Sequence, residues 1–437
     1  MARRGWQPKS NTILSLGAQG QPVIWLQERL QSLGYDVGAI DGLYGYLTED
    51  CVCSLQREFG LKPDGIAGPE VFELLQDEEV VNRRYSHFVG NDTLLTDIAQ
   101  EHSVPVEMLK LWNPALMGKE RIKGGSHLIL HRLALWGGMV GSLSGSQPIS
   151  PHHDSYQKVE GLLFYHYGLT AAGDVVGDMP QSVYSVVPAD TTLIPVISNL
   201  GQELYDVQAL EVLLRRRSAR HGLMKVTKQL AKDLKYGGIA LDLHGVELGY
   251  GRRFAALIGE IRSILRHYGK RLYMTLIPSP NGTRPFPKYV ASHVWTSLPH
   301  RIIFHASQEY IGGEPGPRLG LSWLQAQIRR VQSHIPPWKL MVVLPLGGIA
   351  WVVGEGLREY NYLSYDDVRK LAYEKQAKPQ WDVVEKVPYY DYRHPEGRVR
   401  VWYENRESVE TKLVWLSKQH VTGVVFMPLG WEDARIW

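Results

Sequence analysis

The stretch Gly237-Gly238-Ile239-Ala240-Leu241-Asp242-Leu243-His244 decides the fold. Its odd-numbered positions from 239 are large and apolar, whereas the even-numbered ones include Asp242 and His244, an alternation typical of a β-strand. Helical patterns flank it at residues 223–236 and 254–268. A strand between helices indicates a parallel sheet, in which functional side chains gather at the carboxyl ends of the strands. Asp242 and His244 lie at such an end.

Further runs of strand character alternate with helical patterns from residue 156 onward. Eight strands in this length of chain predict a (β/α)8 barrel, the TIM-barrel fold. The predicted strands are Gly161–Tyr167, Ser182–Pro188, Leu193–Asn199, Gly238–Leu243, Arg271–Ile277, Arg301–His305, Lys339–Leu344 and Thr422–Met427.

The opening stretch resembles the fourth-strand signature of family 18 glycoside hydrolases, D-x-x-D-x-D-x-E. On that pattern the key positions hold Gly237, Ala240, Asp242 and His244. The resemblance implies that the last position donates a proton and that the preceding aspartate orients the substrate's N-acetyl group, which attacks the sugar. His244 therefore occupies the proton-donor position, and Glu247, three residues later, is a candidate replacement acid.

Two more positions depart from the family pattern. The sixth-strand motif M-x-Y-D/E falls on residues 304–307, which places Ala306 where a tyrosine should hold the acetamido group. Met427 stands where the family has the tryptophan under the cleaved sugar. Because three groups that act on one transition state are replaced, we expect a barrel that has lost catalysis. The alternative is an active N-acetylglucosaminidase that uses His244 or Glu247 as proton donor.

A late segment makes the resemblance more specific. Val401-Trp402-Tyr403-Glu404-Asn405, followed by Ser408 and Lys412, is similar to the V-W-F-E-D-x-x-S-x-x-x-K segment of sporulation-type family 18 enzymes. Those enzymes join wall-binding modules to the barrel and act on spore cortex peptidoglycan. The resemblance implies that residues 156–437 form the barrel.

Residues 11–80 contain three helical patterns separated by loops rich in glycine and aspartate. The sequence G-Y-x-x-G-x-I-D-G-x-Y-G-x-x-T begins at Gly34, and Q-x-x-x-G-L-x-x-D-G-I-x-G begins at Gln56. Together they resemble the three-helix peptidoglycan-binding domain. The aspartates and glycines of these loops are also typical turn formers, so they can shape the loops without touching a ligand.

Residues 84–132 resemble a LysM module, a small βααβ unit that binds N-acetylglucosamine chains. The resemblance places its sugar groove between two loops, and residues 133–155, rich in glycine and serine, read as a linker. The predicted glycan-binding residues, with two from the barrel, are Asn91, Asp92, Thr93, Leu94, Asn113, Pro114, Asp242 and Met427.

The charge composition of the chain limits the classes of molecule that it can be expected to bind. A net charge of +3 over 437 residues does not favour nucleic-acid binding. The basic run Arg215–Arg217 with Arg220 is either a solvated helix face or a patch for an anionic wall polymer. Peptidoglycan or another N-acetylglucosamine polymer is the expected partner; we expect no cofactor and no metal, and the sequence does not indicate an oligomeric state.

The beginning of the chain bears on location. Met1–Ser15 has two arginines but no apolar segment, so no secretory signal is recognisable, and no stretch is long enough to span a membrane. We expect a protein of the spore coat, cortex or cell wall, with the cytoplasm as the alternative.

Overall fold

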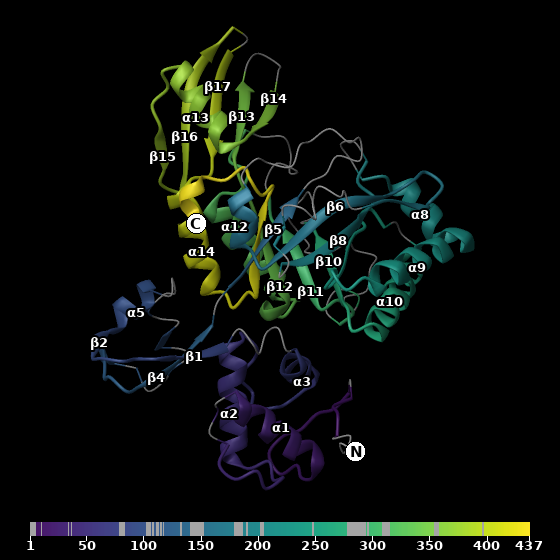
Figure 1. Cartoon of the computed structure of the whole chain (residues 1–437), viewed down its shortest axis with the longest axis vertical. Helices are drawn as coiled ribbons and strands as arrows, with labels where there is room; N and C mark the ends of the chain where they lie inside the picture. Colours follow the sequence, from purple (N-terminus) through teal and green to yellow (C-terminus); the bar gives the residue numbers. More distant parts are fainter. Residues whose placement is uncertain are drawn as a thin grey trace. The chain divides into compact units, whose positions relative to one another are not determined.

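The computed structural model describes most of the chain, which divides into two compact units. One unit contains residues 1–133 and the other most of residues 134–437 (Figure 1). The described residues are 6–9, 11–33, 35, 37–77, 84–101, 106, 109–110, 113, 116, 118–131, 133–139, 153–178, 187–188, 191–201, 205–246, 249–277, 294, 297–307, 315–353, 358–395 and 397–437.

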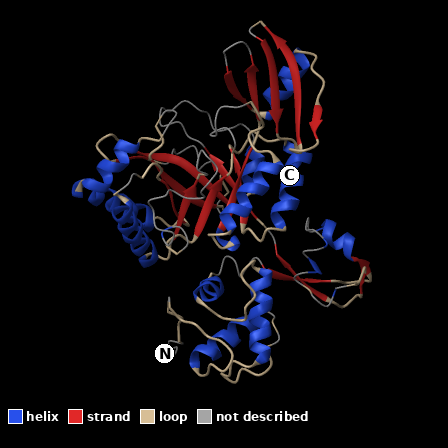
Figure 2. Ribbon diagram, turned by 180° about the vertical axis from the view of Figure 1, so that it is seen from behind, coloured by secondary structure: helices blue, strands red, loops and turns tan. Residues whose placement is uncertain are grey.

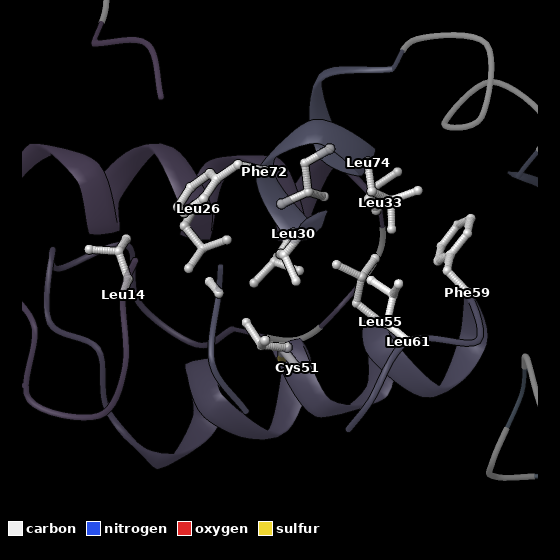
Figure 3. Close-up of a cluster of buried hydrophobic side chains, with 14 of the residues drawn as sticks. Leu14, Leu26, Leu30, Leu33, Cys51, Leu55, Phe59, Leu61, Phe72 and Leu74 are labelled. Carbon is white, nitrogen blue, oxygen red and sulfur yellow. The ribbon is translucent and has the colours of Figure 1, made fainter. Parts of the chain in front are cut away.

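The first part of the chain is a three-helix domain, as predicted. Its helices are α1 (Gln21–Ser32), α2 (Tyr46–Glu58) and α3 (Pro69–Gln76). A proline at the start of α1 and of α3 suits the first turn of a helix, where the amide hydrogen has no partner in the helix. Figure 3 shows leucines from all these segments packed into one core, in which Leu30 and Leu55 are fully buried.

Two turns of this domain are built in the same way. The side chain of Gln27 donates to Asp41 Oδ1 at 3.0 Å and to the Leu43 carbonyl at 3.1 Å, and its oxygen accepts from the Gly42 amide at 3.0 Å. The side chain of Gln56 makes the equivalent three bonds to residues 64–66, at 2.9, 3.0 and 2.9 Å. The glycine of each turn has a positive φ, 73° and 69°. The aspartates and glycines quoted from the sequence therefore shape the backbone.

The next segment is a small unit of strands and helix. Antiparallel β1 (Arg84–Phe88) pairs with β4 (His127–His131), and a short pair joins β2 (Thr93–Leu94) to β3 (Arg121–Ile122). Helix α5 (Leu95–Glu101) lies between them in sequence and buries Leu95 and Ile98. Strand, helix and strand follow one another as in the expected βααβ order; the LysM assignment itself stays a prediction.

The eight-stranded parallel barrel is confirmed. Hydrogen-bonded neighbours run in the order β5-β18-β12-β11-β10-β9-β8-β6, and pairing of β5 with β6 closes the ring. A ninth strand, β7 (Val175–Gly177), pairs antiparallel with β6. The barrel strands are β5 (Ala134–Met139), β6 (Gly161–Leu169), β8 (Thr192–Ser198), β9 (Gly238–Asp242), β10 (Arg271–Leu276), β11 (Arg301–His305), β12 (Leu340–Pro345) and β18 (Gly423–Met427).

The first barrel strand was not where the sequence placed it. β5 lies in the stretch expected to be a linker, whereas the predicted strand at 182–188 falls almost entirely outside the described residues. The two glycines of β5, Gly137 and Gly138, suggested a linker, but in the structure they allow other side chains to pack closely against the strand. A Cβ on Gly137 would lie 2.6 Å from a methyl carbon of Leu429, and one on Gly138 would lie 3.0 Å from Met427.

Helices cover the outside of the barrel strands (Figure 2). The interior is filled by a separate apolar cluster that includes Trp136, Tyr273 and Met341. The helices and short 3-10 turns between residue 153 and the end of the chain, apart from α13 (Tyr365–Glu374), are α8 (Val207–Arg215), α9 (Arg217–Lys232), α10 (Gly251–His267), α12 (Leu321–Gln332), α14 (Arg406–Ser417), η2 (His153–Lys158), η3 (Pro337–Lys339) and η4 (Ala434–Ile436).

An antiparallel sheet is inserted between the last two barrel strands, a feature that the sequence analysis did not predict. Its strand order is β14-β13-β17-β16-β15, and helix α13 (Tyr365–Glu374) packs on one face through Val368. The strands are β13 (Gly348–Val353), β14 (Arg358–Leu363), β15 (Gln380–Asp382), β16 (Val387–His394) and β17 (Gly397–Tyr403).

Candidate functional site at the carboxyl end of the barrel

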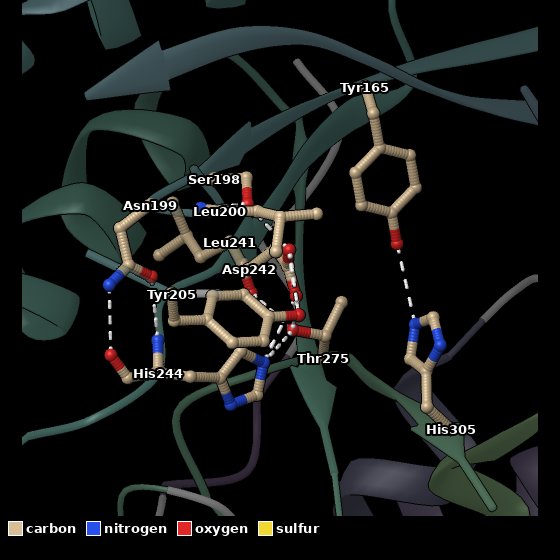
Figure 4. A network of polar contacts seen from close by, with 10 residues as sticks. All are labelled: Tyr165, Ser198, Asn199, Leu200, Tyr205, Leu241, Asp242, His244, Thr275 and His305. Carbon is tan, nitrogen blue, oxygen red and sulfur yellow. Dashed lines mark hydrogen bonds and ion pairs between the residues drawn. The ribbon is translucent and has the colours of Figure 1, made fainter. Parts of the chain in front are cut away.

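Asp242, the last residue of β9, is the centre of a buried polar network (Figure 4). Its side chain is 1% exposed. Ser198 at the end of β8 donates to Oδ2 at 2.6 Å, and Thr275 on β10 donates to Oδ1 at 2.6 Å. The hydroxyl of Tyr205 lies 3.2 and 3.3 Å from the two oxygens, and His244 Nε2 lies 3.0 Å from Oδ1. Four protein groups therefore occupy both carboxylate oxygens.

The network stabilises the charged form of this carboxyl group. Burial by itself would raise the pKa of Asp242, because a charge is costly in a medium of low polarity. The hydrogen bond from His244, the nearby charges of His244 and His305, and the bond from Ser198 outweigh that cost and lower the pKa to about 2. Asp242 is therefore an anion that only accepts hydrogen bonds.

His244 is held at both its backbone and its ring. Its amide donates to Asn199 Oδ1 at 2.9 Å, and its carbonyl accepts from Asn199 Nδ2 at 2.9 Å. Nε2 faces ionised Asp242 and lies 2.8 Å from Thr275 Oγ1, so Nε2 must carry the proton. In the neutral ring Nδ1 then has no hydrogen to donate. Figure 4 shows this second nitrogen directed away from Asp242, so proton donation from it requires a doubly protonated, cationic His244.

A second histidine enters the site from β11. Ile303 belongs to the interior cluster, and side chains alternate along a strand, so His305 also points inward. Its Nε2 lies 3.4 Å from the hydroxyl of Tyr165. Burial lowers the pKa of His305 to about 4, with the charge of Asp242 acting in the opposite direction.

This orientation corrects the sequence-based register of the sixth-strand motif. The inward residue at the strand end is His305, whereas Ala306 lies one residue beyond the strand and accepts a hydrogen bond from Trp323 through its carbonyl. The inward side chain at the end of β11 is therefore His305, and Ala306 is not part of the strand. The sequence of this short apolar strand does not by itself determine which of its residues point inward.

The other expected site residues have mixed outcomes. Met427 ends β18 and packs against the interior cluster, on the wall of the barrel. Glu247 lies outside the described residues, so its part as a replacement acid stays a prediction.

Four residues of the network were missed by sequence reasoning: Ser198, Tyr205, Thr275 and His305. For Ser198 and Thr275 a signal was present, since each is a polar residue on the inward face near the carboxyl end of an apolar strand. Tyr205 comes from the segment between β8 and α8 and had no such signal. Its ring lies 4.6 Å from that of His244, centre to centre.

The predicted sugar-binding loops of residues 84–132 show structural contacts. Asp92 Oδ1 accepts from the Gly124 amide at 2.8 Å, which joins the two loops that flank β2 and β3. Asn113 donates from Nδ2 to the Leu109 carbonyl at 2.9 Å and so ends a helical turn. Pro114 lies outside the described residues. Sugar binding by Asn91, Asp92, Thr93, Leu94 and Asn113 is untested by these contacts.

The part of the chain that the structure describes contains neither a metal-binding cluster nor a membrane-spanning helix. No group of three or more histidine, cysteine, aspartate or glutamate side chains has the arrangement to hold a metal ion. Among the helices formed by those residues, none has the length and apolar character needed to cross a membrane.

Comparisons with known proteins identify the family. The family model described as glycosyl hydrolases family 18 matches residues 206–430, slightly more than half of the chain. The chain therefore belongs to family 18 of the glycosyl hydrolases. A model described as a peptidoglycan binding domain matches residues 19–75, which covers the three helices.

Relatives and solved structures agree with this assignment. The chain is 24% identical to the uncharacterized glycosylase YvbX of Bacillus subtilis over 61% of this chain and 79% of that protein. It is 20% identical to the cortical fragment-lytic enzyme of the same organism, over 57% of this chain and 59% of that enzyme. The crystal structure of the Bacillus cereus spore cortex-lytic enzyme SleL matches with a TM-score of 0.62 and 16% identity, covering 98% of this chain and 96% of that one.

Proposed function

We propose that this family 18 chain attaches to peptidoglycan through its helical domain and that its barrel binds a glycan without cleaving it. The observation that carries the proposal is the state of Asp242. In the family mechanism this position must bind the substrate's acetamido group. Here both oxygens already accept from four protein donors and the side chain is 1% exposed.

The proton donor supports the same conclusion. His244 uses its Nε2 hydrogen to bind Asp242, so the neutral ring cannot deliver a proton from Nδ1 to a glycosidic oxygen. Loss of a positioned general acid costs about 10²- to 10⁴-fold in rate. The inward position of the sixth strand is His305 rather than a tyrosine, and Met427 replaces the aromatic platform. Restoring the acid alone as His244→Glu should therefore give no turnover.

Attachment to peptidoglycan rests on the match of residues 19–75 to the peptidoglycan binding domain. Large apolar side chains are exposed around the two turns of that domain: Leu43 is 48% exposed and Ile66 is 42% exposed, at equivalent positions after each Asp–Gly pair. These two side chains are the residues that we propose to contact the polymer. Relatives named for the spore cortex associate the chain with the spore or cell wall, and a place in the spore cortex or coat is the finer form of the proposal.

The test is co-sedimentation of the full-length chain with purified cortex peptidoglycan, with soluble products followed by mass spectrometry. We expect the wild type to sediment with the polymer and to release no disaccharide or muropeptide. The paired substitution Leu43→Ser and Ile66→Ser should reduce sedimentation at least several-fold, whereas Leu234→Ser, at an apolar side chain that is 93% exposed elsewhere, should not. Release of fragments that His244→Gln abolishes would establish the active glycosidase instead.

A further inference from the structure

The positive charge of the chain is concentrated on two neighbouring helices outside the barrel. Residues 215–232, which include α9, contain seven lysines and arginines and no aspartate or glutamate. Residues 251–267, which form α10, contain four arginines and one glutamate. Seven plus four less one gives a net charge of +10 for these two segments, whereas the whole chain has a net charge of +3. The remainder of the chain is therefore negative.

The basic side chains of α9 form a straight line. Arg217, His221, Lys225, Lys228 and Lys232 are separated by four, four, three and four residues. At 3.6 residues per turn these positions fall within an arc of about 80° along a length of about 22 Å. All five side chains are exposed, and the opposite side of the helix is buried against the rest of the unit. We refer to these five residues as the α9 stripe.

Two acidic groups beside α9 do not neutralise the stripe. Glu260, the acid of α10, forms an ion pair with Arg220, which projects from α9 to one side of the stripe. Asp174 lies beside Gly222, on its other flank. Among the described residues, no ion pair joins a member of the stripe to a carboxylate. Its charges are therefore available to a partner.

We propose that the α9 stripe binds a phosphodiester-linked polymer of the cell wall. The inference rests on the proposed attachment to peptidoglycan, which brings the chain to where such polymers occur. Phosphate groups pair strongly with arginine and lysine. Its four lysines and arginines, Arg217, Lys225, Lys228 and Lys232, form a line one side chain wide with gaps of about 4.5 to 12 Å along the helix axis, which suits a linear polymer that carries repeated anions.

A lipid surface fits the stripe less well. A helix that lies on a membrane buries an apolar face beside its basic one. The exposed side chains of the stripe are all polar, and Leu234, exposed just after α9, is a single apolar residue. On a flat membrane the four charges of the stripe would contact a single row of lipid headgroups. A flexible polymer can instead bend along the helix and contact all four charges.

The test uses the full-length chain and purified poly(glycerol phosphate) wall teichoic acid, with affinity measured at several salt concentrations. The variant is Lys225→Gln, Lys228→Gln and Lys232→Gln, because glutamine keeps the helix propensity of lysine. The control, called the α13 control, removes three exposed cations in and shortly after α13 as Arg369→Gln, Lys370→Gln and Lys378→Gln. Thermal unfolding of each variant establishes that the fold is kept.

We expect the wild type to bind teichoic acid with strong salt dependence. The stripe variant should bind at least about tenfold more weakly, with a log–log salt slope smaller by about 2, as expected for the loss of three phosphate contacts. The α13 control should bind like the wild type. Equal binding by wild type and stripe variant, or an equal loss in the α13 control, would overturn the proposal.

Two further binding measurements distinguish failure of the teichoic acid proposal from failure of the proposed attachment to peptidoglycan. Binding to peptidoglycan stripped of teichoic acid should be the same for the wild type and the stripe variant; no binding by either would contradict the proposed function but leave the teichoic acid result standing. Vesicles of anionic phospholipid should bind the wild type weakly. If the stripe variant lost binding to vesicles and kept its affinity for teichoic acid, a membrane would be the partner and the proposal would be wrong.

Discussion

Two buried carboxylates in the barrel unit, Glu404 and Asp242, belong to segments that resemble family motifs, and they differ in how completely the surrounding motif is present. Glu404 accepts from Lys412 Nζ at 2.8 and 2.6 Å and from Ser408 Oγ at 2.6 Å, and all three residues are almost fully buried. The family pattern at these three positions is complete. Around Asp242 the residue types that do chemistry in the family are replaced.

The difference separates two kinds of motif residue. Glu404 directly follows β17, the last strand of the inserted sheet in sequence, and Lys412 lies on α14, so their ion pair links the end of the sheet to a helix. Loss of either partner would leave a buried charge alone. His244 and His305, by contrast, lie inside an intact barrel that is filled by its own apolar cluster. The apolar cluster and the strand pairing form the barrel with these two histidines in place, so the barrel fold does not require the family's residues at these positions.

The largest effect is expected at the structural pair. Lys412→Met leaves Glu404 buried without its cation and should destabilise the barrel unit by about 3–5 kcal/mol, measured by urea unfolding. Adding Glu404→Gln removes the unpaired charge and should recover a large part of that loss. A double variant as unstable as the sum of the single ones would show that the pair does not act as a unit.

A smaller effect, dependent on pH, is expected at His305. Its folded pKa is lowered from 6.5 to about 4. The neutral form is therefore favoured in the folded chain, and its contribution to stability is complete above pH 6.5 and is lost as the pH falls toward 4. The loss is on the order of 3 kcal/mol. His305→Gln should flatten the pH dependence of the unfolding free energy in this window, and an unchanged profile would contradict the burial of the ring.

The smallest of the three effects belongs to Asp242. Its folded pKa is lowered from 3.8 to about 2. The charged form contributes stability above pH 3.8 that is lost as the pH falls through 2, by about 2 kcal/mol. In Asp242→Asn that acid limb should disappear, in urea titrations between pH 4.5 and 2. Retention of the limb in the variant would assign it to other carboxyl groups.

Much of the fold followed from sequence patterns. The strand at 238–242 and the strand Arg301–His305 were predicted from alternation and lie where expected. The strand at 134–139 was missed because Gly137 and Gly138 suggest flexibility, while their actual role is to admit Leu429 and Met427. The sequence of a single strand does not indicate contacts with residues almost three hundred positions away.

The site was less predictable than the fold. Asp242 and His244 were found because they lie in one strand pattern. The groups that determine their chemistry come from other strands and loops, namely Ser198, Tyr205 and Thr275. The sixth strand shows the limit most clearly, because an error of one residue in register exchanges His305 for Ala306 and reverses which side chain enters the site.

The most direct measurement of the central claim is release of reducing ends from cortex glycan fragments by the full-length wild type, followed from pH 4 to pH 8. A range of pH is needed because donation from Nδ1 requires a cationic His244 ring. We expect no release above that of a heat-treated sample at any pH. Release that rises at acidic pH, is abolished by His244→Gln and survives in the α13 control would contradict it and make His244 the general acid.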